Sequence, residues 1–149
     1  MKRVLGLDVG DVRIGVAISD ELRITARGLF SIIRTNIKTD TQRIIDEIIA
    51  NDCSDVIIGL PLNLSGQDSL QTEKVREFAR KLENKLVSSA MKDVGVMLYD
   101  ERFSTVLAER ALKEAGVKQA KMKEVIDQHA AIVILEDWLR LNNISNPQL

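Results

Sequence analysis

The chain has 149 residues, 45% of them hydrophobic, and a formal net charge of −1, values typical of one globular domain with a buried core. A single cysteine excludes an internal disulfide, and a single histidine excludes a multi-histidine metal site. No segment is apolar enough to span a bilayer and the first residues do not resemble a signal peptide, so we expect a cytoplasmic protein with no membrane partner. Aromatic residues make up only 3%, so any nucleic-acid binding must rest on local basic patches.

The first part of the chain predicts three antiparallel strands. Residues 3–9 and 13–19 read as strands, and the short turn between them favours a hairpin. A third strand is predicted over about 28–33. Thr39 followed by Gln42 is typical of a capping box and predicts the start of a helix that carries two pairs of isoleucines one turn apart.

The second part predicts alternating strands and helices. The all-apolar run 56–60 is typical of a central parallel strand, and a polar loop over 61–71 leads into a helix over about 69–90. A strand is predicted over 95–100, and helices over about 105–115 and 123–141, with a basic link over 117–123 between them. Residues 142–149 read as a frayed tail.

This order predicts one domain over residues 1–149, in the α/β class, with a mixed five-stranded sheet and helices on both faces. The first strand lies near the centre in this arrangement. Its carboxyl end then lies beside the carboxyl ends of the strands 56–60 and 95–100. Ligands of open α/β sheets bind at such an edge.

Asp8 is the most unusual residue of the first strand, because it is a carboxylate among Val4, Leu5, Leu7 and Val9. A buried carboxylate is costly unless a cation or hydrogen-bond donors meet it. Glycines stand two residues away on both sides and would clear the same face of the strand. We therefore interpret Asp8 as a site residue; the alternative is a capping Asp near a turn.

Two further acids interrupt apolar patterns. Glu101 directly follows the strand 95–100, where it is either a site residue or a solvated loop acid. Asp127 heads the apolar face of the last helix, where it is either a site residue or a first-turn acid. Two or three carboxylates without histidine favour a hard cation, Mg²⁺ or Mn²⁺, and two such ions can clamp a phosphodiester. Asp8, Glu101 and Asp127 are thus the predicted catalytic and metal-binding residues.

Four motifs in order resemble the YqgF/RuvX family, whose members are described as Holliday-junction-resolvase-like and as pre-16S rRNA nucleases. The motifs are Leu7-Asp8-Val9-Gly10 with Arg13-Ile14-Gly15-Val16-Ala17, Gly59-Leu60-Pro61-Leu62-Asn63 with Gly66, Asp100-Glu101-Arg102 with Ser104-Thr105, and Asp127 with Ala130-Ala131. The resemblance covers residues 4 to about 140 and implies a ribonuclease H-like fold and a cytoplasmic, metal-dependent nuclease, a hydrolase of phosphodiester bonds.

By position, Asp8, Glu101 and Asp127 match the family's acidic residues. The residues that match its other motif positions, and that the resemblance implies as substrate-binding, are Arg13, Asn63, Gly66, Arg102 and Thr105. Arg13 and Arg102 could instead be surface or carboxylate-paired arginines, and Gly66 could simply form a turn. Leu64-Ser65 departs from the family's usual residues before Gly66, and Phe103 stands where leucine is common.

The implied function is 5′-end maturation of pre-16S rRNA in ribosome biogenesis, with structured RNA as the partner. Three alternatives remain open. One is a Holliday junction resolvase in DNA recombination or repair, which would bind branched DNA. Another is a non-catalytic, nucleic-acid-binding ribosome-maturation factor. The third is an ATPase, because Asp-Xaa-Gly with Gly15 also resembles the phosphate-binding hairpin of the actin and Hsp70 fold. The sequence shows no clear interface stripe, so we expect a monomer or a weak homodimer.

Overall fold

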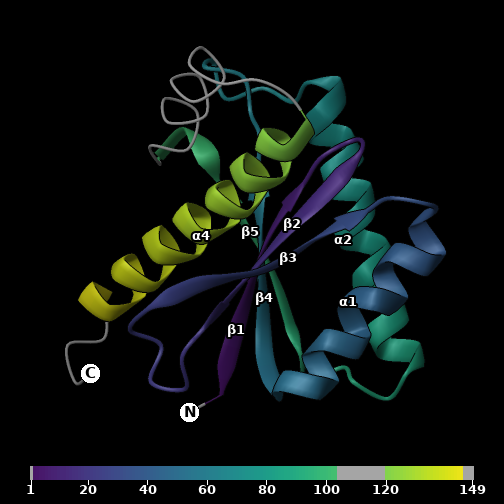
Figure 1. Cartoon of the computed structure of the whole chain (residues 1–149), viewed down its shortest axis with the longest axis vertical. Coiled ribbons are helices and arrows are strands. Elements are labelled where there is room, and N and C mark those ends of the chain that lie inside the picture. Colours follow the sequence, from purple (N-terminus) through teal and green to yellow (C-terminus); the bar gives the residue numbers. More distant parts are fainter. Residues whose placement is uncertain (1, 104–119, 146–149) are drawn as a thin grey trace.

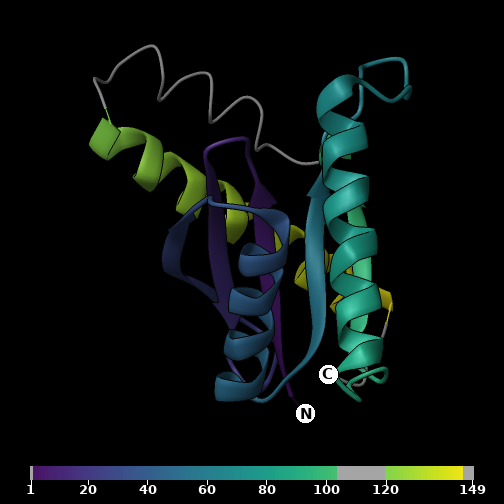
Figure 2. The same cartoon turned by 90° about the vertical axis from the view of Figure 1, so that its right-hand side faces the viewer.

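The computed structural model describes residues 2–103 and 120–145, with side chains in the last helix described from Gln128 to Asn143. Five strands form one sheet in the order β3-β2-β1-β4-β5, with β1 at its centre (Figure 1). The strands are β1 (Arg3–Val9), β2 (Arg13–Ser19), β3 (Ala26–Ile33), β4 (Cys53–Leu60) and β5 (Gly95–Asp100). The helices are α1 (Ile37–Asn51), α2 (Leu70–Ser88), the short 3-10 helix η1 (Glu101–Phe103) and α4 (Ala120–Ser145). Helices cover both faces of the sheet, as the sequence predicts (Figures 1 and 2).

The sheet is mixed, because β1 pairs with β2 in antiparallel and with β4 in parallel orientation. Asp8 lies opposite Gly15 across the hairpin, and Leu7 lies opposite Ile58 of β4. The parallel pair β4·β5 ends at Leu60 opposite Asp100. The carboxyl ends of β1, β4 and β5 therefore meet at one edge, as predicted from the order of elements.

Alternation along the strands separates two hydrophobic cores. One face carries side chains such as Leu5, Leu7 and Val9 and is covered by α1 and α2. The other face carries Val4, Ala17 and Ile57 and is covered by α4. Asp8 lies on the same face as Val4, because it follows Val4 by an even number of residues on β1.

The first two helices begin at polar caps. The N-cap of α1 is Asn36, whose side chain accepts a hydrogen bond from Thr39 N at 2.8 Å. The predicted start at Thr39 is therefore wrong by one turn, because an asparagine cap outcompetes the Thr39–Gln42 pattern. Ser69 caps α2 in a capping box with Thr72, close to the predicted boundary.

Small residues let α4 lie close to the sheet. A Cβ on Gly6 would lie 2.8 Å from the Cβ of Leu135, so any side chain there would displace the helix. Ala130, Ala131, Ile134 and Leu135 are buried against this face. The helix runs obliquely across the strands, on the side opposite to α1 and α2 (Figures 1 and 2).

The last helix is longer than predicted at both ends, since it spans Ala120–Ser145 rather than 123–141. The prediction that the tail frays from residue 142 is wrong for 142–145. The Asn142 side chain donates to Trp138 O at 2.9 Å, and Asn143 donates to Arg23 O at 3.4 Å. These hydrogen bonds accompany the continuation of the helix through residues 142 and 143, where the composition predicts a frayed tail.

Part of the predicted chain lies outside the described residues. This applies to the helix predicted over 105–115, to Thr105 and to the residues after Ser145. Across the described residues, none of the helices combines the length and apolarity that crossing a bilayer requires.

Candidate active site

Asp8 and Glu101 line one small pocket at the carboxyl edge of the sheet. The pocket has a volume of about 240 Å³ and is lined by Asp8, Val9, Gly10, Asp11, Gly59, Pro61, Gln71 and Glu101. Asp8 is 6% exposed and Glu101 is 2% exposed. Two nearly buried carboxylates from different strand ends thus share one cavity, as the strand order predicts.

Gly59 makes room for the Glu101 carboxylate. A Cβ at Gly59 would lie 2.5 Å from Glu101 Oε1 and 2.5 Å from Ile134 Cδ1 of α4. Real Cβ atoms do not approach other atoms so closely, so only glycine leaves space for both neighbours at this point of β4. The acid at the end of β5 therefore reaches over β4 towards β1.

Asp127 lies on α4, the helix that covers the face of the sheet bearing Asp8. The backbone therefore places it on the same side of the sheet as Asp8, but its side chain lies outside the described residues. Its role as a third acid stays a prediction, and so does the role of Thr105.

Arg13 begins β2 and stands two residues before Gly15, the partner of Asp8 across the hairpin. Strand alternation therefore directs its half-buried side chain to the same face as Asp8. This position is compatible with the predicted phosphate contact, which remains a prediction.

Arg102 is paired with a carboxylate. Its Nη2 donates to Asp100 Oδ2 at 2.7 Å, and its Nε and backbone N also donate to the same carboxylate. Arg102 lowers the pKa of Asp100 below its ordinary value of 3.8, because hydrogen bonds from the guanidinium and backbone favour the ionised form. The structure thus shows Arg102 paired with Asp100. This pairing was the alternative to a role in phosphate binding.

The polar loop 61–71 is closed by its own turn. Gly66 has φ +86 and its N–H donates to Asn63 O at 2.8 Å, while Asn63 N donates to Gln67 O at 2.9 Å. Gly66 also lies beside Arg102, since a Cβ there would be 2.9 Å from Arg102 Nη1. Gly66 therefore forms a turn and gives Arg102 access to the loop, and the exposed Asn63 lies at the start of that turn.

Gln71 and Asp11 line the pocket but were not singled out from the sequence. The Gln71 side chain donates to Val9 O at 3.1 Å, and Asp11 pairs with Lys74 at 3.2 Å. Both residues lie in stretches that read only as a loop or a turn, and no local pattern distinguishes them. Their place in the site follows from the long-range approach of α2 to the hairpin.

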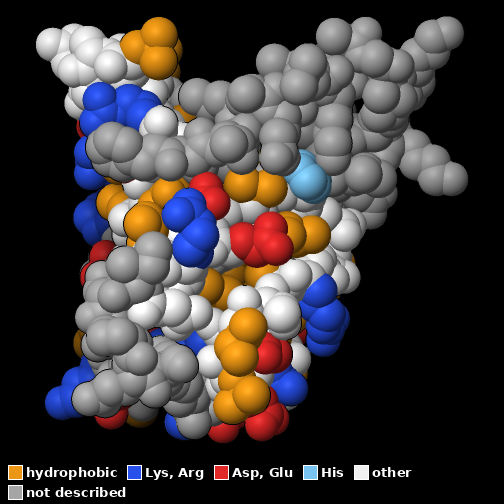
Figure 3. All heavy atoms as spheres, turned by 90° about the vertical axis from the view of Figure 1, so that its left-hand side faces the viewer, with side chains coloured by type: hydrophobic (Ala, Val, Ile, Leu, Met, Phe, Trp, Pro, Cys, Tyr) orange, Lys and Arg blue, Asp and Glu red, His pale blue; other side chains and the backbone are white. Residues whose placement is uncertain are grey.

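Charges of both signs are mixed on one face of the molecule (Figure 3). On the face drawn in Figure 3, Asp and Glu side chains lie beside Lys and Arg side chains, with hydrophobic groups between them. This agrees with the near-zero net charge and with recognition by local contacts.

Burial raises the pKa of the Cys53 thiol to about 11, so this residue is a neutral core side chain.

The donor set suits a hard divalent cation. Carboxylate oxygens in a small polar pocket are the ligands that Mg²⁺ and Mn²⁺ prefer. Within residues 2–103 and the described part of α4, no group of three acidic, histidine or cysteine side chains gathers as a metal site. The metal-binding role of Asp8 and Glu101 therefore stays a prediction.

A family model described as "RuvX: Holliday junction resolvase" matches residues 2–141. The chain belongs to the RuvX family. The predicted resemblance to the YqgF/RuvX family is confirmed, and it covers nearly the whole chain. The match spans the hairpin with Asp8, the end of β5 with Glu101, and α4 up to residue 141.

Relatives of this RuvX-family chain carry a more specific name. A protein of Koribacter versatilis (strain Ellin345) is 40% identical over 98% of this chain and 92% of its own length. A protein of Myxococcus xanthus (strain DK1622) is 43% identical over 92% of this chain and 87% of its own length. Both are named "Putative pre-16S rRNA nuclease". The family description and these names indicate a nuclease, a hydrolase of phosphodiester bonds.

Solved structures establish the fold. RuvC of T. thermophilus in complex with Holliday junction substrate matches with a TM-score of 0.58 at 16% identity, over 95% of this chain and 96% of that one. The yeast mitochondrial Holliday junction resolvase matches with a TM-score of 0.57 at 10% identity, over 93% and 78%. The predicted ribonuclease H-like fold is thereby confirmed.

Proposed function

We propose that this chain is a metal-dependent nuclease that matures the 5′ end of pre-16S rRNA in the cytoplasm. The observation that carries the proposal is the pair of nearly buried carboxylates, Asp8 and Glu101, in one pocket at the carboxyl edge of the sheet. Burial of two acids is unfavourable unless cations or donors compensate them. The names of the relatives support rRNA as the substrate.

Asp8 and Glu101 would hold Mg²⁺ or Mn²⁺, with Asp127 of α4 as the third acid of a two-ion site. Bound divalent ions supply an activated water and stabilise the leaving oxygen of a phosphodiester. The protein's own contribution is to hold its carboxylates apart from bulk solvent in fixed orientations. Gly59 contributes by leaving the room that Glu101 occupies.

Substrate contacts would come from residues around this edge, which we assign as Arg13, Asn63, Gly66, Arg102 and Thr105. Arg13 is supported by its place on the Asp8 face. Arg102 would have to exchange its carboxylate partner Asp100 for a phosphate, which matches the guanidinium in a similar geometry. We propose that the protein acts as a monomer or a weak homodimer.

A second candidate substrate is a four-way DNA junction. The family description names a Holliday junction resolvase, which supports this alternative within the same chemistry. The two candidates share the carboxylate site and differ only in the nucleic acid that it receives.

The test is a cleavage assay on the purified protein with and without Mg²⁺ or Mn²⁺. Its substrates are a 5′-extended 16S precursor RNA, a four-way DNA junction and plain single strands. Metal-dependent cleavage of the precursor RNA near its mature 5′ end is expected. Preferred cleavage of the junction would favour the second candidate. Binding without any cleavage would contradict the nuclease and indicate a maturation factor, and ATP hydrolysis without nucleic acid would indicate an ATPase.

A further inference from the structure

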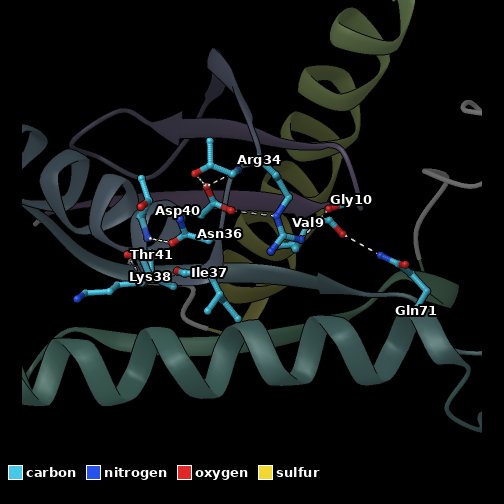
Figure 4. Close-up of polar contacts among 11 residues, drawn as sticks. Val9, Gly10, Arg34, Asn36, Ile37, Lys38, Asp40, Thr41 and Gln71 are labelled. Atoms are coloured by element: carbon cyan, nitrogen blue, oxygen red, sulfur yellow. Dashed lines mark hydrogen bonds and ion pairs between the residues drawn. The ribbon is translucent and has the colours of Figure 1, made fainter.

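Side chains from two neighbouring elements hold the backbone that directly follows Asp8. Arg34 Nη1 donates to Gly10 O at 2.9 Å, and Gln71 Nε2 donates to Val9 O at 3.1 Å (Figure 4). The backbone N of Arg34 also donates to Val12 O at 2.9 Å. The turn between β1 and β2 is therefore attached to Arg34 at two separate carbonyls.

Arg34 is itself held in place. Its Nε donates to Asp40 Oδ2 at 3.2 Å, and its guanidinium lies 5.4 Å from the centroid of the Phe78 ring. Asp40 is 2% exposed in the first turns of α1 and also accepts from Thr35 N at 3.2 Å. A guanidinium fixed by a buried carboxylate and a ring face has few alternative orientations.

Neither Arg34 nor Asp40 lines the pocket of Asp8 and Glu101. Both line a neighbouring pocket of about 630 Å³ between the hairpin turn, α1 and α2, and the two pockets have Asp11 in common. The direct link from this pair to the site is the hydrogen bond from the Arg34 side chain to Gly10 O, and the backbone N of Arg34 adds the contact with Val12 O.

We propose that Arg34 and Asp40 are a positioning pair that fixes the Val9–Val12 backbone and thereby aims the Asp8 carboxylate. This inference rests on the proposed nuclease function, because it assigns a role to the pair in the use of Asp8. Small errors in the placement of a reacting group are costly, since a misplacement of about 1 Å can lower a rate about 100-fold. The hydrogen bond from Arg34 to Gly10 O would limit such errors by holding the turn after Asp8.

An arginine suits this role better than a lysine. Arg34 uses Nε for Asp40 and Nη1 for Gly10, so one planar group joins the buried acid to the turn. A lysine ammonium is a single point of donation on a flexible stem and cannot reproduce that fork. Arg34→Lys therefore keeps the charge beside Asp40 and is expected to fold, while the connection to Gly10 is lost.

The experiment combines Arg34→Lys with the double variant Arg34→Gln/Asp40→Asn, which removes both charges together and leaves no unpaired buried acid. Arg43→Gln is the matched control, because Arg43 also lies over a ring, 5.2 Å from the centroid of Phe30, but is an exposed residue of α1 outside both pockets. Measurements are kcat and KM for the nucleic acid that the wild type cuts, at a temperature where each variant is folded. Hydrogen exchange of amides 9–12 is measured without nucleic acid.

We expect kcat to fall at least about tenfold in both Arg34 variants, with KM within about twofold of the wild type, because the pair does not line the pocket of Asp8 and Glu101. Exchange of amides 9–12 should rise at least about fivefold, while amides 4–7 of β1 remain protected. Arg43→Gln should change neither quantity.

Three results would overturn the positioning pair. A raised KM with unchanged kcat would make Arg34 a substrate contact. A lower melting temperature with unchanged kcat would make the pair merely structural. Unchanged exchange at 9–12 would show that the turn does not depend on Arg34. If the wild type cuts no nucleic acid, the proposed function fails, and the exchange measurement still decides whether the pair orders the turn.

Discussion

At the scale of single residues, glycines decide how closely the carboxylates and α4 approach the sheet. Gly59 has Glu101 Oε1 on one side and Ile134 on the other, both 2.5 Å from the place of a Cβ. The pattern of glycines around Asp8 could be recognised in the sequence, because it interrupts a strand. The role of Gly59 could not be predicted, since it depends on the side chain of Glu101, 42 positions later in the chain.

We predict that Gly59→Ala lowers nuclease activity strongly, because the new methyl group must displace Glu101, Ile134 or both. Overpacking of this kind costs about 1–3 kcal/mol of unfolding free energy. The cleavage rate and the urea midpoint measure the two effects. The matched control is Gly28→Ala on the same face, where the nearest atom is the Oε1 of Gln128, the flexible end of a long side chain, at 3.0 Å. Equal activity in the two variants would contradict this role of Gly59.

At the scale of elements, Arg102 joins the end of β5 to the loop 61–71. It binds Asp100 through several hydrogen bonds, its Nη1 lies 3.5 Å from Leu64 O, and Gly66 leaves room for it. The sequence predicted a polar loop and a basic residue after the strand as separate features. Their contact could not be predicted, because it depends on the parallel pairing of β4 and β5.

We predict that Asp100→Asn increases hydrogen exchange in residues 62–68, because the guanidinium loses its ionised partner. In the wild type the pKa of Asp100 is lowered below 3.8, since Arg102 favours the charged form. The stabilisation is therefore fully present at neutral pH and is lost only as the pH falls below that value. Exchange in this loop, corrected for the intrinsic pH dependence, should be constant from about pH 5 to pH 8. A titration within this range would contradict the assignment.

At the scale of the whole molecule, the sheet separates a core under α1 and α2 from a second core under α4. The five-stranded mixed sheet and the meeting of three strand ends at one edge could be predicted, because strand type and order follow from local patterns. The N-cap at Asn36 and the full length of α4 could not be predicted, since capping and tertiary contacts override local propensity at these helix ends. The Arg34–Asp40 pair is local in sequence, but its contacts with Gly10 and with Phe78 of α2 depend on distant segments.

We predict that Gly6→Ala moves α4 away from the sheet, because its Cβ would lie 2.8 Å from Leu135 Cβ and 3.1 Å from Ala131 O. The expected loss is about 1–3 kcal/mol of unfolding free energy, measured by urea denaturation. Since α4 carries Asp127, activity should fall in the folded variant as well. Substitution of the exposed Glu136 by alanine, on the outer side of the same helix, is the control and should change neither. A Gly6→Ala protein with wild-type stability and rate would show that the close approach of α4 is unimportant.

The proposed metal-dependent nuclease requires Asp8 as an ionised carboxylate. The most direct measurement is the cleavage rate of Asp8→Asn with Mg²⁺, on the nucleic acid that the wild type cuts, with the melting temperature recorded on the same sample. The substitution keeps the size of the side chain and removes its charge. A rate reduced at least about 1,000-fold in a folded protein is the predicted result, because charge stabilisation at the reacting phosphate depends on it. A rate within about twofold of the wild type would show that the nuclease does not use Asp8.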